Sequence, residues 1–180
     1  LSNDRADLRV FVALRLPETA IGQVVELTER LRKAISFTGC RPRWVAGSGI
    51  HLTLAFLGNQ PRTRVDEVAA MLADLAQRET THRLELRRLG VFPHWRRPSV
   101  LWVGVRDRSH RLADMHRELN QRLAAARFAV DRRPFQPHIT IARFRNYVDL
   151  SAVERLVFQH STFRTAIFNA DALVLYQSIL

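Results

Sequence analysis

Residues 51–54 read His-Leu-Thr-Leu, and residues 138–141 repeat the same pattern as His-Ile-Thr-Ile. Each stretch lies in a short apolar run, 50–57 or 137–144, of the kind that is typical of a half-buried strand. Because successive side chains of a strand point to opposite faces, the histidine and the threonine of each stretch should share one face. Two such strands facing each other would form a site with two imidazoles and two hydroxyls.

The paired His51 and His138 suit a reaction that needs an acid and a base at the same time. Unperturbed imidazole titrates at about 6.5, so at neutral pH one ring can carry a proton while its partner does not. The stiff, β-branched Thr53 and Thr140 suit hydrogen bonding to the non-bridging oxygens of a phosphoryl group. Arg143 follows in the second run, and alternation places it opposite His138 unless the strand twists or bulges.

The rest of the chain alternates between predicted strands and helices. Strands are expected over 9–16, 50–57, 83–89, 99–105, 137–144, 163–168 and 172–178, and helices over 17–34, 63–76, 109–123 and from 151 onward. The motif falls on the second strand of each half. This duplicated order predicts one α+β domain over 1–180, with lobes at about 8–90 and 91–180. Two mostly antiparallel sheets with outer helices would surround a central cleft with pseudo-twofold symmetry.

Several finer features are also predicted. Ser109 should cap the third helix, and Ser151 with Glu154 should form a capping box on the fourth. Phe56 should lie on the apolar face of the first motif strand, and residues 169–171 should be the turn between the last two strands. The remaining histidines are expected at the surface: His82, His94, His110, His116 and His160.

Arginine dominates the charge of the chain, with 28 Lys and Arg residues against 17 acids, a net charge of +11 and a single lysine. Such an excess favours a polyanionic partner such as nucleic acid, although a base-composition bias toward arginine codons explains it equally well. Two basic loops precede the motif strands and supply the candidate RNA contacts Arg41, Arg43, Trp44, Arg132 and Arg133. The alternatives are a tryptophan that packs on the core and arginines that are solvated at the surface.

The composition narrows the class of protein. An apolar content of 47% suffices for a core, and no apolar run approaches the roughly 18 residues of a membrane helix. With no signal-peptide pattern and with Cys40 as the only cysteine, a cytoplasmic protein without an internal disulfide is expected. Zinc is the main rival explanation for paired histidines. It needs a third ligand, which neither motif offers nearby on the same face, so no metal or cofactor is expected.

These residues resemble the 2H phosphoesterase superfamily, which is defined by two H-x-T/S-x motifs. The sequence is most similar to its bacterial and archaeal RNA 2′,3′-cyclic phosphodiesterases, first described as 2′-5′ RNA ligases. The likeness covers residues 9–13, 51–58, 101–104, 135–143 and 173–178. It implies a bilobal fold and metal-independent hydrolysis of an RNA-terminal 2′,3′-cyclic phosphate to a 2′-phosphate.

The resemblance also implies roles for the motif residues. His51 would donate a proton to the 3′ leaving oxygen, and His138 would accept a proton from water. Thr53, Thr140 and Arg143 would bind the phosphate. The expected partner is RNA with cyclic phosphate ends, with tRNA fragments and small cyclic nucleotides as candidate substrates. Two alternatives remain open: 2′-5′ ligation of tRNA halves, and a non-catalytic module that binds RNA ends. A monomer is expected, because the duplicated halves complete one site.

Overall fold

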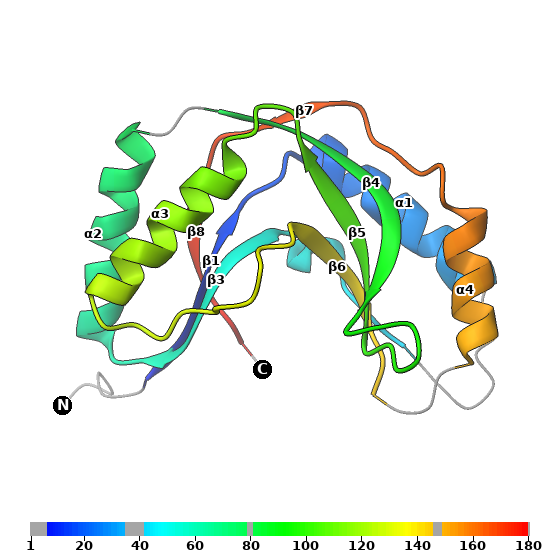
Figure 1. Ribbon diagram of the computed structural model, residues 1–180, viewed down its shortest axis with the longest axis horizontal. Helices are drawn as coiled ribbons and strands as arrows, with labels where there is room; N and C mark the ends of the chain where they lie inside the picture. Colours follow the sequence, from blue (N-terminus) through cyan, green and yellow to red (C-terminus); the bar gives the residue numbers. More distant parts are fainter. Residues whose placement is uncertain (1–6, 35–41, 79–80, 146–148, 180) are drawn as a thin grey trace.

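The computed structural model describes residues 7–34, 42–78, 81–145 and 149–179. Figure 1 shows the elements in chain order: β1 (Leu8–Leu14), α1 (Glu18–Ala34), β2 (Arg43–Trp44), the 3-10 helix η1 (Gly47–Gly49), β3 (Leu52–Gln60), α2 (Arg62–Arg78), β4 (His82–Phe92), β5 (Val100–Asp107), α3 (Leu112–Ala125), β6 (His138–Arg143), α4 (Leu150–Gln159), β7 (Phe168–Ala170) and β8 (Leu173–Gln177).

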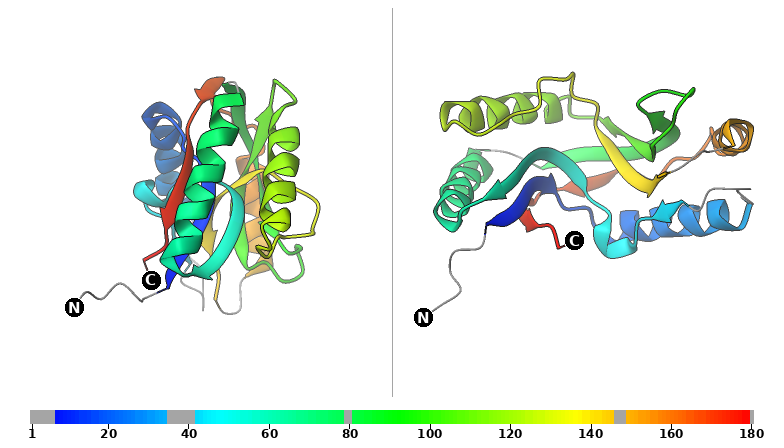
Figure 2. Two further views of the ribbon diagram at one scale, coloured as in Figure 1. Left: turned by 90° about the vertical axis from the view of Figure 1, so that its left-hand side faces the viewer. Right: turned by 90° about the horizontal axis from the view of Figure 1, so that it is seen from below.

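The strands form two sheets, one in the order β3-β1-β8 and one in the order β2-β6-β5-β4-β7. Every pair of neighbouring strands is antiparallel. The right-hand view of Figure 2 shows two layers, with α1 and α2 beside the three-stranded sheet and α3 and α4 beside the five-stranded sheet. The predicted α+β fold with two antiparallel sheets and outer helices is therefore confirmed.

The two sheets do not follow the predicted lobe boundary at about residue 90. β4 begins before that residue, yet it pairs with β5 in the five-stranded sheet. The closing strands do not form a hairpin, because β7 pairs with β4 whereas β8 crosses to the other sheet and pairs with β1. Of the strand predicted over 163–168, only residue 168 lies in β7, and Arg164 forms an isolated bridge to Arg87.

Buried apolar side chains of the sheets and helices form a continuous core. On β1 the alternating Val10, Val12 and Leu14 are buried, as the alternation predicts. The buried residues of α3 recur at every third or fourth position, as on one face of a helix: Leu112, Met115, Leu119 and Leu123. A fully buried aliphatic side chain stabilises a fold by roughly 1.5–3 kcal/mol, so these helices are held by packing. No helix in the described part of the chain is long and apolar enough to span a membrane.

Aspartates, rather than the predicted serines, satisfy the N-termini of two helices. The Asp107 carboxylate accepts hydrogen bonds from the backbone N–H groups of Ser109 and Leu112, both at 2.8 Å, at the start of α3. Asp149 is the N-cap of α4, and it also accepts a hydrogen bond from the Ser151 hydroxyl at 2.7 Å. Each aspartate precedes the predicted serine by two residues, and its carboxylate reaches the free backbone N–H groups of the first turn. The predicted serine caps are wrong.

Candidate active site

A bulge in β3 determines which of its side chains lie beside His51. Leu54 has no partner in β1, whereas Thr53 and the residue after Leu54 are both paired. The extra residue reverses the alternation that follows it, so Phe56 pairs with Phe11 on the face that carries His51 and Thr53. The ring centroids of Phe11 and His51 are 4.7 Å apart, and Phe56 is 65% exposed. The prediction that Phe56 lies on the apolar face is therefore wrong.

A second bulge, in β6, decides the direction of Arg143. Ile141 has no partner in β5, although the residues on either side of it are paired. Ile141 and Ala142 are consequently both buried, and Arg143 faces the same side as His138 and Thr140. Simple alternation would place the guanidinium on the opposite face. We call the face of each sheet that carries the motif histidine and threonine its motif face.

His51 lies immediately before β3, in a partly buried aromatic environment. Its ring centroid is 4.7 Å from that of Phe11 and 5.5 Å from that of Tyr176 on β8. Burial lowers the pKa of His51, because the charged imidazolium loses hydration, and the positive charge of Arg143 lowers it further. The neutral ring is thus favoured in the free protein, and a proton on His51 is readily given up.

His138 is the first residue of β6, and its orientation is set by a backbone hydrogen bond. Its Nδ1 lies 2.7 Å from the carbonyl oxygen of Gln136. A carbonyl can only accept, so Nδ1 carries a hydrogen, and in the neutral ring Nε2 is left with its lone pair. Burial lowers the pKa of His138, the bond to Gln136 opposes this, and the charge of Arg143 lowers the pKa again.

Phe92 and Trp102 flank His138 on the motif face of the five-stranded sheet. The ring centroid of His138 is 4.8 Å from that of Phe92 and 6.3 Å from that of Trp102. Trp102 occupies the space above its partner Gly90, where a Cβ would come within 2.2 Å of the indole. Neither aromatic residue was singled out from the sequence. Trp102 lies in the strand predicted over 99–105, so alternation was an available signal, whereas Phe92 lies beyond the strand predicted over 83–89 because β4 extends further.

The candidate RNA contacts ahead of the first motif have different surroundings. Arg43 is exposed and pairs with Arg143 across β2 and β6. Trp44 is half-buried and packs against the core, and the Arg32 guanidinium lies 5.9 Å from its ring centroid. These contacts favour a packing role for Trp44. Arg41 lies outside the described residues.

In the loop ahead of the second motif, both arginines are exposed. Arg133 donates hydrogen bonds of 3.0 Å from Nε to both carboxylate oxygens of Asp131. The bonded guanidinium lowers the pKa of Asp131 to about 2. Arg133 is therefore partly neutralised, whereas Arg132 keeps its charge exposed.

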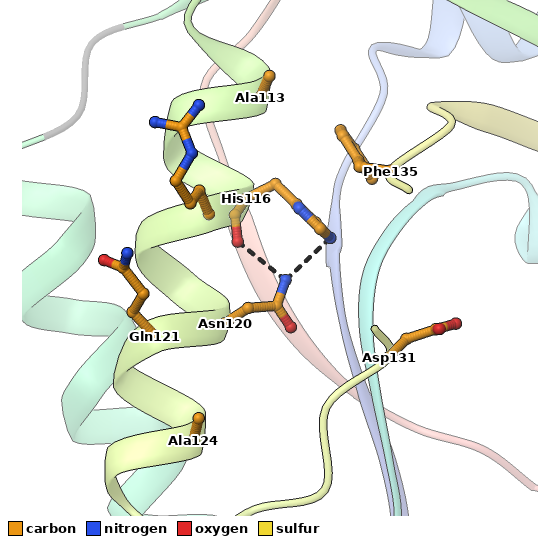
Figure 3. Close-up of a pocket in the computed structure, with 8 residues that line it drawn as sticks. Ala113, His116, Asn120, Gln121, Ala124, Asp131 and Phe135 are labelled. Atoms are coloured by element: carbon orange, nitrogen blue, oxygen red, sulfur yellow. Dashed lines mark hydrogen bonds between the residues drawn. The ribbon is translucent and has the colours of Figure 1, made fainter. Parts of the chain in front are cut away.

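A pocket of about 430 Å³ lies beside α3, and none of its lining residues is a motif histidine or threonine (Figure 3). Its lining residues are Ala113, His116, Arg117, Asn120, Gln121, Ala124, Asp131 and Phe135. The His116 ring stacks on Phe135 with centroids 3.8 Å apart, and its Nε2 accepts a hydrogen bond from Asn120 at 2.9 Å. Burial lowers the pKa of His116, and a hydrogen bond to the backbone of Leu54 partly opposes this shift. His116 thus connects α3 to the β3 bulge and to the loop before β6.

Two histidines that were predicted at the surface are therefore packed inside the fold. His116 is half-buried by the contacts above, and His82 is only 2% exposed, with its Nε2 at 3.2 Å from the Met115 sulfur. Their helix and strand positions gave no sign of these contacts, which depend on other elements. Across the described ranges, no group of three or more His, Cys, Asp or Glu side chains is arranged to bind a metal ion.

Comparison with known proteins places this geometry in a family. A model of the 2′-5′ RNA ligase superfamily matches residues 16–179. The RNA 2′,3′-cyclic phosphodiesterase of Aeropyrum pernix is 32% identical over 151 residues, which span 84% of this chain and 85% of the relative. The crystal structure of TT0787 from Thermus thermophilus has a TM-score of 0.69 at 28% identity, over 93% of this chain and 87% of that one. The structure of Escherichia coli LigT complexed with 3′-AMP has a TM-score of 0.67 at 25% identity, over 97% and 90%. The chain belongs to the 2′-5′ RNA ligase superfamily.

Proposed function

We propose that this protein is an RNA 2′,3′-cyclic phosphodiesterase, which hydrolyses the terminal cyclic phosphate to a 2′-phosphate. The observation that carries the proposal is the bulge at Ile141, which places Arg143 on the face of β6 that carries His138 and Thr140. Burial lowers the pKa of both motif histidines, and the positive charge of Arg143 lowers both further. This positive charge beside two imidazoles would attract an anionic phosphate. The family and its relatives named as RNA 2′,3′-cyclic phosphodiesterases support the same reaction.

In the proposed complex, three side chains hold the phosphate. Arg143 neutralises charge on the non-bridging oxygens and can form two parallel hydrogen bonds to them. Thr53 and Thr140 donate from their hydroxyls, and their stiff χ1 angles keep these donors in place as the charge on the oxygens grows. Each threonine lies on a motif face, so the phosphate is held between the two sheets.

The two histidines then move the protons. His138 accepts a proton from a water molecule whose oxygen attacks phosphorus, and the bond from phosphorus to the 3′ oxygen breaks. His51 donates its proton to that leaving oxygen, which yields a 3′-hydroxyl and a 2′-phosphate. Each transfer contributes on the order of 10²–10⁴ in rate. The bond from His138 to Gln136 suits the acceptor role, because it directs the Nε2 lone pair away from the backbone.

The reaction uses no metal in this proposal, and this separates it from the zinc alternative. The test is to incubate purified protein in excess chelator with an oligoribonucleotide that ends in a 2′,3′-cyclic phosphate. Phosphorus NMR of the product end should show a 2′-phosphate. Loss of turnover in chelator would restore the zinc explanation. A 3′-phosphate product would mean that the 2′ oxygen is the leaving group, and it would overturn the assigned geometry.

Ligation of tRNA halves is the second candidate, since it reverses the same chemistry. It predicts a 2′-5′ linked product when both halves are supplied. A module that only binds RNA ends predicts salt-dependent binding without turnover. A cytoplasmic monomer acting on RNA, with tRNA fragments or small cyclic nucleotides as substrates, completes the proposal.

A further inference from the structure

We propose that Arg87 and Arg164 bind phosphates of the RNA strand upstream of its cyclic end. This inference rests on the proposed function and extends it, because it makes an oligonucleotide a better substrate than a cyclic mononucleotide. Neither arginine takes part in the chemistry described above. Strand pairing connects both arginines to His138 across the five-stranded sheet.

Four residues that pair from strand to strand form a row across the five-stranded sheet, and this row begins at His138. His138 pairs with Gly104 on β5, Gly104 pairs with Arg87 on β4, and Arg87 forms a bridge with Arg164 in the segment before β7. Residues directly opposite each other in antiparallel strands have side chains on the same face. All members of the row therefore belong to the motif face.

The bridge to Arg164 is part of a longer pairing along β4. The backbone N–H of Thr165 donates to the carbonyl of Leu86 at 2.9 Å, and the N–H of Arg88 donates to Phe163 at 3.1 Å. These bonds fix the segment beside the strand. With neighbouring strands about 4.8 Å apart, the Cα atoms of Arg87 and Arg164 lie roughly 10 Å and 14 Å from that of His138.

Gly104 lies between His138 and Arg87 in this row and contributes no side chain of its own. A Cβ at this position would lie 3.0 Å from the Arg87 carbonyl oxygen and 3.3 Å from the Trp102 ring. The Trp102 indole therefore borders the Gly104 position, and a strand of RNA that leaves His138 would cross β5 beside this ring. Arg87 then lies on the next strand, directly opposite Gly104.

The charges of the two arginines are available for a ligand. Within the part of the chain that the structure describes, neither Arg87 nor Arg164 forms an ion pair, and Arg164 is exposed. Glu85, two residues before Arg87 on the same face, is already bound by Arg108 at 2.8 Å and 3.2 Å. Arginine binds phosphate oxygens with paired donors, so this row matches a polyanionic strand.

The test compares a hexaribonucleotide that ends in a 2′,3′-cyclic phosphate with adenosine 2′,3′-cyclic phosphate. The double substitution Arg87→Ala with Arg164→Ala should raise KM for the hexamer about tenfold and leave its kcat unchanged. Hydrolysis of the mononucleotide, which lacks upstream phosphates, should not change. The slope of log kcat/KM against log salt should fall by about 0.7 for each arginine removed.

Matched variants separate a local contact from net charge. Arg155→Ala removes one exposed charge from α4 and should leave KM for the hexamer unchanged. Arg87→Lys keeps the charge but not the paired donors, so it should raise KM less than Arg87→Ala does. Equal losses on both substrates, or no loss on the hexamer, would overturn the proposal. A KM effect from Arg43→Ala without one from the double variant would show that the strand leaves over β2 instead.

Failure of the arginine contacts can be told apart from failure of the proposed function. If the unaltered protein hydrolyses neither substrate, the proposed function fails, and the row is then judged by binding. Fluorescence anisotropy with a labelled hexamer ending in a 2′-phosphate should show affinity reduced about tenfold in the double variant. Equal affinity of the two proteins would refute the row as an RNA contact.

Discussion

Arg143 lies on the same face of β6 as Thr140, although the two residues are three positions apart along the strand. The reason is Ile141, which has no partner in β5 and reverses the alternation. The bulge therefore places the Arg143 guanidinium on the same face as the Thr140 hydroxyl and the His138 imidazole. Its charge acts on both motif histidines.

The first prediction concerns pH. Burial and Arg143 lower the pKa of both His51 and His138 below their ordinary value of 6.5. A bell-shaped profile has its maximum midway between the two pKa values, so kcat/KM should peak below pH 6.5. Arg143→Gln removes a positive charge, raises both pKa values and should shift the maximum to higher pH as it lowers activity. A maximum that stays in place in the variant would show that the charge does not reach both rings.

Removing either motif histidine should abolish most of the turnover. We expect His51→Ala and His138→Ala each to lower kcat/KM by about 10²–10⁴, the usual contribution of one proton transfer. Thermal unfolding should show that the fold persists, and His94→Ala, which changes an exposed histidine, is the control. Wild-type turnover in either motif variant would contradict the acid-base mechanism.

Gly90 is predicted to be essential for the position of Trp102. In Gly90→Ala the new Cβ would meet the indole at 2.2 Å, so Trp102 must move and the free energy of unfolding should fall by about 1–3 kcal/mol. Gly22→Ala, where nothing lies within 4 Å in the interior of α1, should instead raise it by about 0.5–1 kcal/mol. Chemical denaturation followed by tryptophan fluorescence measures both changes. Equal stability of the two variants would mean that the indole is not confined by the glycine.

His116 is predicted to align the two motif strands from outside the catalytic centre. His116→Ala removes the hydrogen bonds to Leu54 and Asn120 and the stacking on Phe135. We expect the free energy of unfolding to fall by about 1–2 kcal/mol and kcat to fall with it, because Leu54 follows Thr53 directly. Steady-state kinetics below the melting transition measures the second effect. His160→Ala, on the far end of α4, should leave kcat unchanged.

The local pattern predicted much of this molecule because local physics governs it. Alternation predicted the two motif strands, and the pattern over 109–123 predicted the helix that the structure shows as α3. The helix caps were assigned wrongly, since Asp107 and Asp149 satisfy backbone groups from positions that the capping pattern did not single out. His82 and His116 were likewise placed at the surface, because their packing partners come from distant segments.

The sequence by itself determined the two motif strands, the helices that accompany them and the chemistry of their side chains, since these depend on neighbours a few residues away. Tertiary structure alone decided which sheet receives β4 and β8, and where Leu54 and Ile141 interrupt the pairing. Those interruptions turn Phe56 and Arg143 toward the motif faces. A bulge is a mismatch between two paired strands, so it exists only once β1 or β5 lies alongside, and the pattern of one strand does not contain it.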